Sequence, residues 1–169
     1  SLNLAVLLRR REGDSSVKTA ILPVPSSVLD RIIKVPGTGD EKQFLFLEDV
    51  LSTFAERFFL GCEILEATPF RVTRDADLDI DDDAEDLLAE VVKSLKKRKK
   101  GAAVRLELAV SASRMVKTLL MTELALEERD VYMIPGPLDC KVFFSFTGIE
   151  GYDPLRYAPA FPQPSLALE

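Results

Sequence analysis

Short runs of apolar residues, most of them alternating with polar ones, occur at six places in the chain, and such runs are typical of β-strands. The predicted strands are Leu2–Leu8, Val17–Val24, Gln43–Leu47, Cys62–Arg74, Ala102–Val110 and Asp130–Ile134. The first two flank a polar stretch that contains Gly13 and Asp14, which predicts a hairpin. Within the fourth, Pro69 indicates an edge position or a bulge, because proline has no N–H to donate to a neighbouring strand.

Four other segments repeat apolar residues every three or four positions, which is the spacing of one face of a helix. The predicted helical faces are Val28–Ile33, Val50–Phe59, Leu87–Leu95 and Met115–Leu124. The third begins among acidic residues and ends among basic ones, as the helix dipole favours, and Ser111 or Ser113 is placed to cap the fourth. The run Cys140–Phe146 fits either a helix or a strand by its spacing.

Strands that occur partly in hairpins and partly around helices predict the α+β class. We expect a single domain with a mixed, mostly antiparallel sheet and helices packed on one face; a doubly wound α/β sheet is the alternative. Arg105 and Glu107 share the face of their strand that lacks apolar residues, so this face is predicted to be wet. Prolines after Tyr152 predict a domain over residues 1–157 and a linker or extended arm over residues 158–169.

The composition fits a folded domain and excludes several functional classes. Hydrophobic residues make up 47% and charged residues 30% of the 169 positions, which is ordinary for a folded chain. The net charge of −6 argues against nucleic-acid binding, and no apolar run is long enough for a transmembrane segment. Cys62 and Cys140 have no metal ligands near them in sequence, and we interpret both as buried apolar residues in a reducing compartment.

The phenylalanines of two segments are interpreted mainly as core residues. An exposed patch that contacts a partner is the alternative. The residues concerned are Phe54, Phe58, Phe59, Phe143, Phe144 and Phe146.

Charged residues gather at two places. Arg71 and Arg74 stand beside Asp75 and Asp77, and three roles are open: a local salt-bridge network, a contact with another domain or subunit, or direct contact with phosphate. The second place is either a solvated helix end or a surface that steers a polyanion, and it consists of Lys96, Lys97, Arg98, Lys99 and Lys100. The chain has no histidine and no nucleophile with a base beside it, so we predict no catalytic, cofactor-binding or metal-binding residue.

Several segments, in this order, resemble one family. They are Arg57-Phe58-Phe59-Leu60-Gly61, then Pro69-Phe70-Arg71-Val72-Thr73-Arg74-Asp75-Ala76-Asp77-Leu78, then Ala84–Leu88, Ala103–Glu107 and Tyr132–Asp139. Together they are similar to the middle, or head, domain of bacterial polyphosphate kinase of the first type. The string Arg71–Leu78 is the specific part, whereas the helical pieces are generic. Ser111-Ala112-Ser113 and Cys140 depart from the usual pattern of the family.

The resemblance implies a parent enzyme that reversibly transfers the terminal phosphate of ATP to polyphosphate, with magnesium. In that family the phosphate passes through a phosphohistidine in C-terminal domains, which would lie outside this chain. The resemblance therefore implies an excised, non-catalytic structural and dimerisation domain that is inactive alone. Its partners would be the other domains of the same enzyme and a second subunit. The parent would be cytoplasmic, with a membrane-peripheral location as an alternative. An autonomous module that binds polyphosphate is the alternative.

Overall fold

The chain divides into two compact units in the computed structural model, Ser1–Asp139 and Cys140–Glu169. The structure describes residues 2–13, 16–37, 41–75, 101–158 and 160. The predicted helix over Leu87–Leu95 and most of the predicted tail over residues 158–169 lie outside these residues. The predicted boundary at residue 157 stays a prediction.

The first unit is built on a five-stranded sheet with the order β2-β1-β5-β6-β7, and a separate hairpin pairs β3 with β4. The strands are β1 (Leu2–Arg10), β2 (Val17–Pro23), β3 (Ile32–Val35), β4 (Gln43–Phe46), β5 (Cys62–Arg74), β6 (Ala103–Ala109) and β7 (Val131–Ile134). Each neighbouring pair is antiparallel except β6 and β7, which are parallel. The α+β class with a mixed, mostly antiparallel sheet is thus confirmed, and the doubly wound alternative is wrong.

Two α-helices and four short 3₁₀ helices are found among the described residues. They are α1 (Leu47–Thr53), η1 (Ala55–Arg57), α3 (Arg114–Leu124), η2 (Glu128–Asp130), η3 (Cys140–Gly148) and η4 (Asp153–Leu155). The hydroxyl of Ser113 accepts a hydrogen bond from the N–H of Val116 at 3.2 Å, which confirms the predicted cap of α3. Ala125 ends α3 in the left-handed conformation, with φ 53°.

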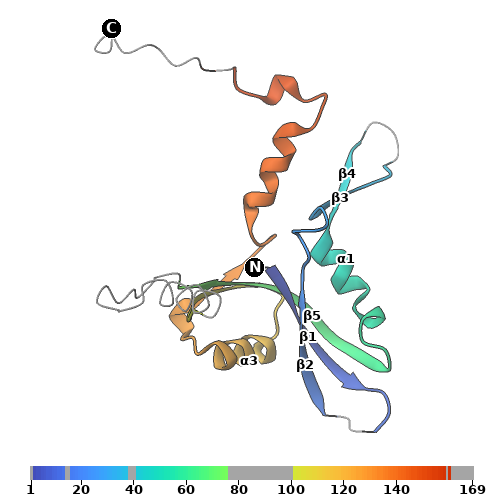
Figure 1. The fold of residues 1–169 in the computed structure, drawn as a ribbon, viewed down its shortest axis with the longest axis vertical. Coiled ribbons are helices and arrows are strands. Elements are labelled where there is room, and N and C mark those ends of the chain that lie inside the picture. Colours follow the sequence, from blue (N-terminus) through green and yellow to red (C-terminus); the bar gives the residue numbers. More distant parts are fainter. Residues whose placement is uncertain (1, 14–15, 38–40, 76–100, 159, 161–169) are drawn as a thin grey trace, which may run out of the picture. The chain divides into compact units, whose positions relative to one another are not determined.

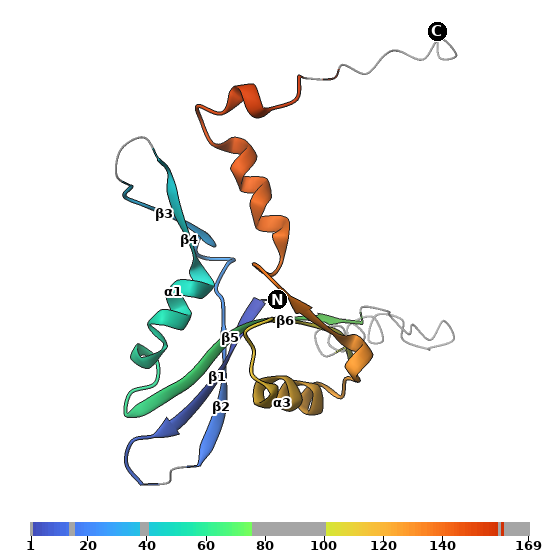
Figure 2. The same cartoon turned by 180° about the vertical axis from the view of Figure 1, so that it is seen from behind.

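The two α-helices of the first unit lie on opposite faces of the sheet, and not on one face as predicted (Figures 1 and 2). The reason is β1, whose residues are apolar on both faces. On one face Leu4 and Val6 pack in a cluster with Leu47 of α1. On the other face Ala5 and Leu7 pack in a cluster with residues of α3, among them Val116 and Leu120.

The predicted helix over Val28–Ile33 is wrong. The N–H groups of Val28 and Leu29 both bond to the carbonyl of Pro25, which gives a single turn, and Ile32–Val35 then pairs with β4. Val28 is 82% exposed, so the apolar spacing of this segment does not correspond to a buried helix face. Pairing with β4 satisfies the backbone of this segment, and tertiary structure overrides the local pattern.

The predicted helix over Val50–Phe59 begins earlier and ends earlier. It runs over Leu47–Thr53, and the chain then leaves helical geometry at Phe54, with φ −104° and ψ 20°. Phe54 and Phe58 are 47% and 52% exposed, so the core interpretation is wrong for these two residues. In the second unit, Phe143, Phe144 and Phe146 are 36%, 77% and 37% exposed, so the core interpretation is wrong for these residues too.

The prediction for Pro69 is confirmed in part. The strand β5 lies in the middle of the sheet, but β6 pairs only with Phe70–Arg74, so Pro69 stands where the second partner strand begins. The residues before it have β1 as their partner, and an irregularity in that pairing falls between Leu7 and Leu8. A proline therefore precedes the segment that needs donors on both sides.

Predictions for Glu107 and Cys140 are also wrong. Glu107 is only 8% exposed, because Arg71 and Arg105 both pair with it, so this face of β6 is not wet at that point. Cys140 is exposed, so its interpretation as a buried apolar residue is wrong, whereas Cys62 is partly buried and packs against the cluster that contains Leu4 and Leu47, which agrees in part with the prediction. Within the described residues, no helix is long and apolar enough to cross a membrane.

Candidate functional site: the charged residues at the end of β5

Arg71 lies on β5 directly opposite Glu107 on β6, so the antiparallel register itself brings the two side chains together. Its Nη1 is 3.3 Å from Oε2 of Glu107, and its Nε is 3.8 Å from Oδ2 of Asp139. The Arg71 side chain is 28% exposed. The guanidinium is thus flanked by two carboxylates of its own unit.

Glu107 also forms an ion pair with a second arginine, Arg105. Nε of Arg105 is 2.9 Å from Oε1 of Glu107, and the Arg105 guanidinium lies over the ring of Tyr132, 4.0 Å from its centroid. Two cations and two carboxylates therefore form one network across β5, β6 and the residue that ends the first unit, Asp139. Such a network leaves little positive potential with which to attract an anion.

Arg74 and Asp75, which the sequence places beside Arg71, both make contacts with the backbone that precedes β6. Nη1 of Arg74 donates to the carbonyl of Gly101 at 2.9 Å, and the N–H of Asp75 donates to the carbonyl of Ala102 at 2.8 Å. Both contacts tie the end of β5 to the start of β6. Of the four predicted contact residues, Asp77 lies outside the described residues, as do Lys96, Lys97, Arg98, Lys99 and Lys100.

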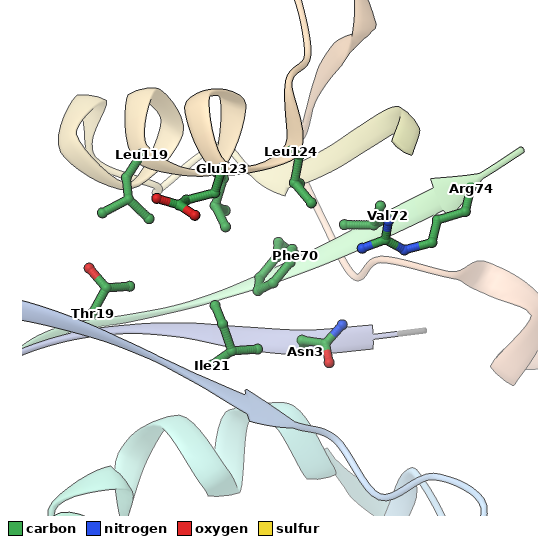
Figure 3. Close-up of a pocket in the computed structure, with 10 residues that line it drawn as sticks. Asn3, Thr19, Ile21, Phe70, Val72, Arg74, Leu119, Glu123 and Leu124 are labelled. Atoms are coloured by element: carbon green, nitrogen blue, oxygen red, sulfur yellow. The ribbon is translucent and has the colours of Figure 1, made fainter. Parts of the chain in front are cut away.

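Arg74 also lines a cavity of about 680 Å³ on the face of the sheet that α3 covers. Figure 3 shows Leu119 and Leu124 of α3 above Phe70 of β5. Ile21 of β2, which lines the same cavity, lies below Phe70 in this view. The remaining lining residues include Asn3, Thr19, Val72 and Glu123. The volume is in the range of small-molecule sites, but the lining is mainly aliphatic and aromatic and contains one cation and one carboxylate.

Sequence reasoning missed a second charged centre, the pair Arg31 and Glu48. Their side chains are only 8% and 4% exposed, and Nε of Arg31 donates to Oε1 and Oε2 of Glu48 at 3.1 and 3.0 Å. Nη1 donates to the carbonyl of Asp139 at 2.8 Å, and Nη2 donates to the carbonyl of Leu138. The segment around Arg31 was predicted only as a helix with an apolar face, and no local signal marked this arginine as buried.

A third polar centre joins β5 to the start of α3. Oε1 of Glu66 accepts from the N–H of Ser113 at 2.9 Å and from the hydroxyl of Thr68 at 2.6 Å. Burial raises the pKa of Glu66, but the hydrogen bonds from Ser113 and Thr68 outweigh it, so the pKa lies below the ordinary value of 4.5. This carboxylate is therefore ionised in the folded protein at neutral pH and holds the N-terminus of α3.

None of these centres has the composition of a metal or acyl-transfer site. Within residues 2–13, 16–37, 41–75, 101–158 and 160, no three His, Cys, Asp or Glu side chains are grouped as metal ligands would be. Burial and the neighbouring Glu48 raise the pKa of Asp49, and Arg31 opposes them. The described polar side chains that converge do so on one another, in ion pairs, caps and carbonyl contacts.

Comparison with known proteins identifies the family. A sequence model described as "Polyphosphate kinase middle domain" matches residues 1–146. The chain belongs to the polyphosphate kinase middle-domain family. Polyphosphate kinases of Halalkalibacterium halodurans and Bacillus cereus are 44% and 42% identical to it, each over 97% of the chain. The resemblance of Pro69–Leu78 and its companion segments to this family is thus confirmed.

The middle-domain chain corresponds to a limited part of these relatives. It spans 24% of the length of both curated polyphosphate kinases. The crystal structure of polyphosphate kinase from Porphyromonas gingivalis has a similar fold, with a TM-score of 0.66 at 21% identity over 98% of this chain and 22% of that one. At that identity the structural match supports the fold alone.

Proposed function

We propose that this chain is a non-catalytic structural module of a polyphosphate kinase, whose other domains transfer the terminal phosphate of ATP to polyphosphate. The observation that carries the proposal is how the charged residues of the first unit are used. Arg71 and Arg105 pair with Glu107, Arg31 pairs with Glu48, and Arg74 holds a backbone carbonyl. These groups maintain the fold and do not converge on a common point where a substrate would react.

The 169-residue chain is expected to show no ATP-dependent synthesis of polyphosphate, with or without Mg²⁺. The assay follows formation of polyphosphate from labelled ATP, with circular dichroism of the same sample as the control for folding. The Halalkalibacterium halodurans polyphosphate kinase, with its full complement of domains, serves as the positive control. Turnover by the folded 169-residue chain would contradict the proposal.

We propose in addition that the module contacts other domains of the same enzyme and takes part in a subunit contact. Support comes from apolar side chains at the end of α1 and η1, because Phe58 is 52% and Leu60 is 87% exposed. Sedimentation equilibrium of the isolated chain, compared with a variant carrying Phe58→Ser and Leu60→Ser, measures self-association. A chain that stays monomeric at every concentration would assign the subunit contact to other parts of the enzyme.

The alternative of an autonomous polyphosphate-binding module has less support among the described residues. Arg71 has two carboxylates beside it, and its guanidinium would have to give up these partners to bind a phosphate. The contribution of Lys96–Lys100 to polyanion binding remains a proposal from sequence. Binding of long-chain polyphosphate at low salt, weakened by replacing this lysine-rich run with glutamine, would favour the alternative.

A further inference from the structure

The side chain of Arg31 is surrounded by three separate segments of the first unit. Its Nε and Nη2 are bonded to the carboxylate of Glu48 on α1, and its own carbonyl accepts from the N–H of Leu47 at 2.8 Å. The guanidinium also lies 5.7 Å from the centroid of the Phe46 ring. Arg31 is therefore fixed in position by the start of α1 before its remaining donors are considered.

The remaining donors of Arg31 reach the last two residues of the first unit. Nη1 bonds to the carbonyl of Asp139 and Nη2 to the carbonyl of Leu138, so one planar group holds two consecutive peptide units. The Leu138 side chain is 3% exposed and packs in the cluster that contains Leu47. The first unit ends at Asp139, and the second unit begins at Cys140.

The backbone held by Arg31 is in a conformation that residues other than glycine seldom adopt. Asp139 has φ 52°, which is the left-handed region. Asparagine and aspartate tolerate this region best, but the conformation persists only where surrounding contacts determine it. The contacts here are the two carbonyl hydrogen bonds from Arg31 and the approach of Arg71 to the Asp139 carboxylate at 3.8 Å.

We propose that Arg31 is a positioning residue that clamps the backbone of Leu138 and Asp139 against α1, so that the chain leaves the first unit in one fixed backbone conformation. A buried ion pair often adds little net stability, so the Arg31–Glu48 pair is not explained by stability alone. A guanidinium fork reaches a carboxylate and two carbonyls at once, whereas a lysine ammonium does not. This inference concerns contacts within the first unit and holds whether or not the proposed function does.

The test is ¹⁵N relaxation of the 169-residue chain, with the amides of Asp139 and Cys140 as reporters of the clamp. Their order parameters are expected near the rigid-backbone value of about 0.85 and to fall below about 0.6 in Arg31→Lys. The amide of Val116 in α3, on the opposite face of the sheet, is expected to keep its value. The matched control is Glu48→Gln, which alters the ion pair but leaves the arginine fork on both carbonyls and is expected to leave Asp139 rigid.

A second variant separates clamping from general stability. Arg31→Met combined with Glu48→Met replaces the ion pair by apolar side chains of similar length, which commonly preserves folding. It is expected to raise the mobility of Asp139 and Cys140 while the chain remains folded. Unchanged order parameters at Asp139 in both Arg31 variants, or an equal loss of order throughout the sheet, would overturn the proposal.

Discussion

Glu66 shows how much of this fold depends on single polar residues in the sheet. Its carboxylate lies on β5 and accepts hydrogen bonds from Thr68 and from the backbone of Ser113. Ser113 in turn caps α3 through its hydroxyl. The hydrogen bonds that link Glu66 on β5 to Ser113, and Ser113 to α3, therefore set where α3 begins. Of these, the sequence indicates only the last, the cap made by the serine.

Replacing Glu66 with glutamine is expected to lower the free energy of unfolding at pH 7 by about 1–3 kcal/mol, because charge-assisted hydrogen bonds to Ser113 and Thr68 are weakened. The pKa of Glu66 is lowered by folding, so its stabilisation is present above the ordinary pKa of 4.5 and is lost as the pH falls through the folded value. Urea unfolding at pH 7 and at successively lower pH values below 4.5 measures both effects.

The difference between wild type and Glu66→Gln should therefore shrink as the pH is lowered. Glu12→Gln, which removes an exposed carboxylate from the hairpin loop, is the control and is expected to leave stability unchanged. A difference that stays constant down to the lowest pH would contradict the assigned role of the carboxylate.

At the scale of elements, α3 is the part that sequence predicted best. Its apolar spacing and its Ser113 cap were both predicted from the sequence, and its buried residues Val116 and Leu120 belong to the predicted apolar face. Met115 does not, because it is 56% exposed although it belongs to the same apolar run. An apolar run shows that a helix has a buried face, but the width of that face depends on what packs against it.

Substitutions on α3 are expected to separate the buried and exposed parts of its apolar run. Leu120→Ala removes a 3%-exposed side chain from the cluster that faces α3 and should cost about 2–5 kcal/mol. Met115→Ala, five residues earlier and at a 56%-exposed position, should change stability by no more than about 0.5 kcal/mol. The midpoints of urea unfolding measure both, and equal costs would show that Met115 has a packing partner.

At the scale of the whole chain, the first unit contains two hydrophobic clusters, and β1 contributes buried residues to both. Residues of β1 alternate between them, with Leu4 in the cluster beside α1 and Leu7 in the cluster beside α3. A residue change on either face therefore acts on a strand on which both clusters depend. The same alternation explains why the helices lie on both faces, because a sheet with two apolar faces must cover both.

The unit Ser1–Asp139 is expected to unfold in one cooperative transition. Leu4→Ala and Leu120→Ala affect opposite faces, and each should shift the midpoint of the same transition by lowering stability about 2–5 kcal/mol without changing the denaturant slope. Far-UV circular dichroism and hydrogen exchange of β1 amides follow the transition. Separate transitions for the two variants would show that the clusters unfold independently.

The sequence by itself determined the class of fold and the family, because both depend on short-range patterns. Strand alternation in Cys62–Arg74, the cap at Ser113 and the string Arg71–Leu78 are all contained in a few neighbouring residues. These patterns do not require knowledge of which elements come together.

Only the tertiary structure decided what the charged residues do. Arg71 and Arg74 are three residues apart in sequence, yet one joins a network with Glu107 and Asp139 and the other holds the carbonyl of Gly101. Arg31 finds its partners 17 and more than 100 residues away, at Glu48 and at the last residues of the first unit. Charges attract at any sequence separation, so their partners follow from strand register and packing, which no local pattern contains.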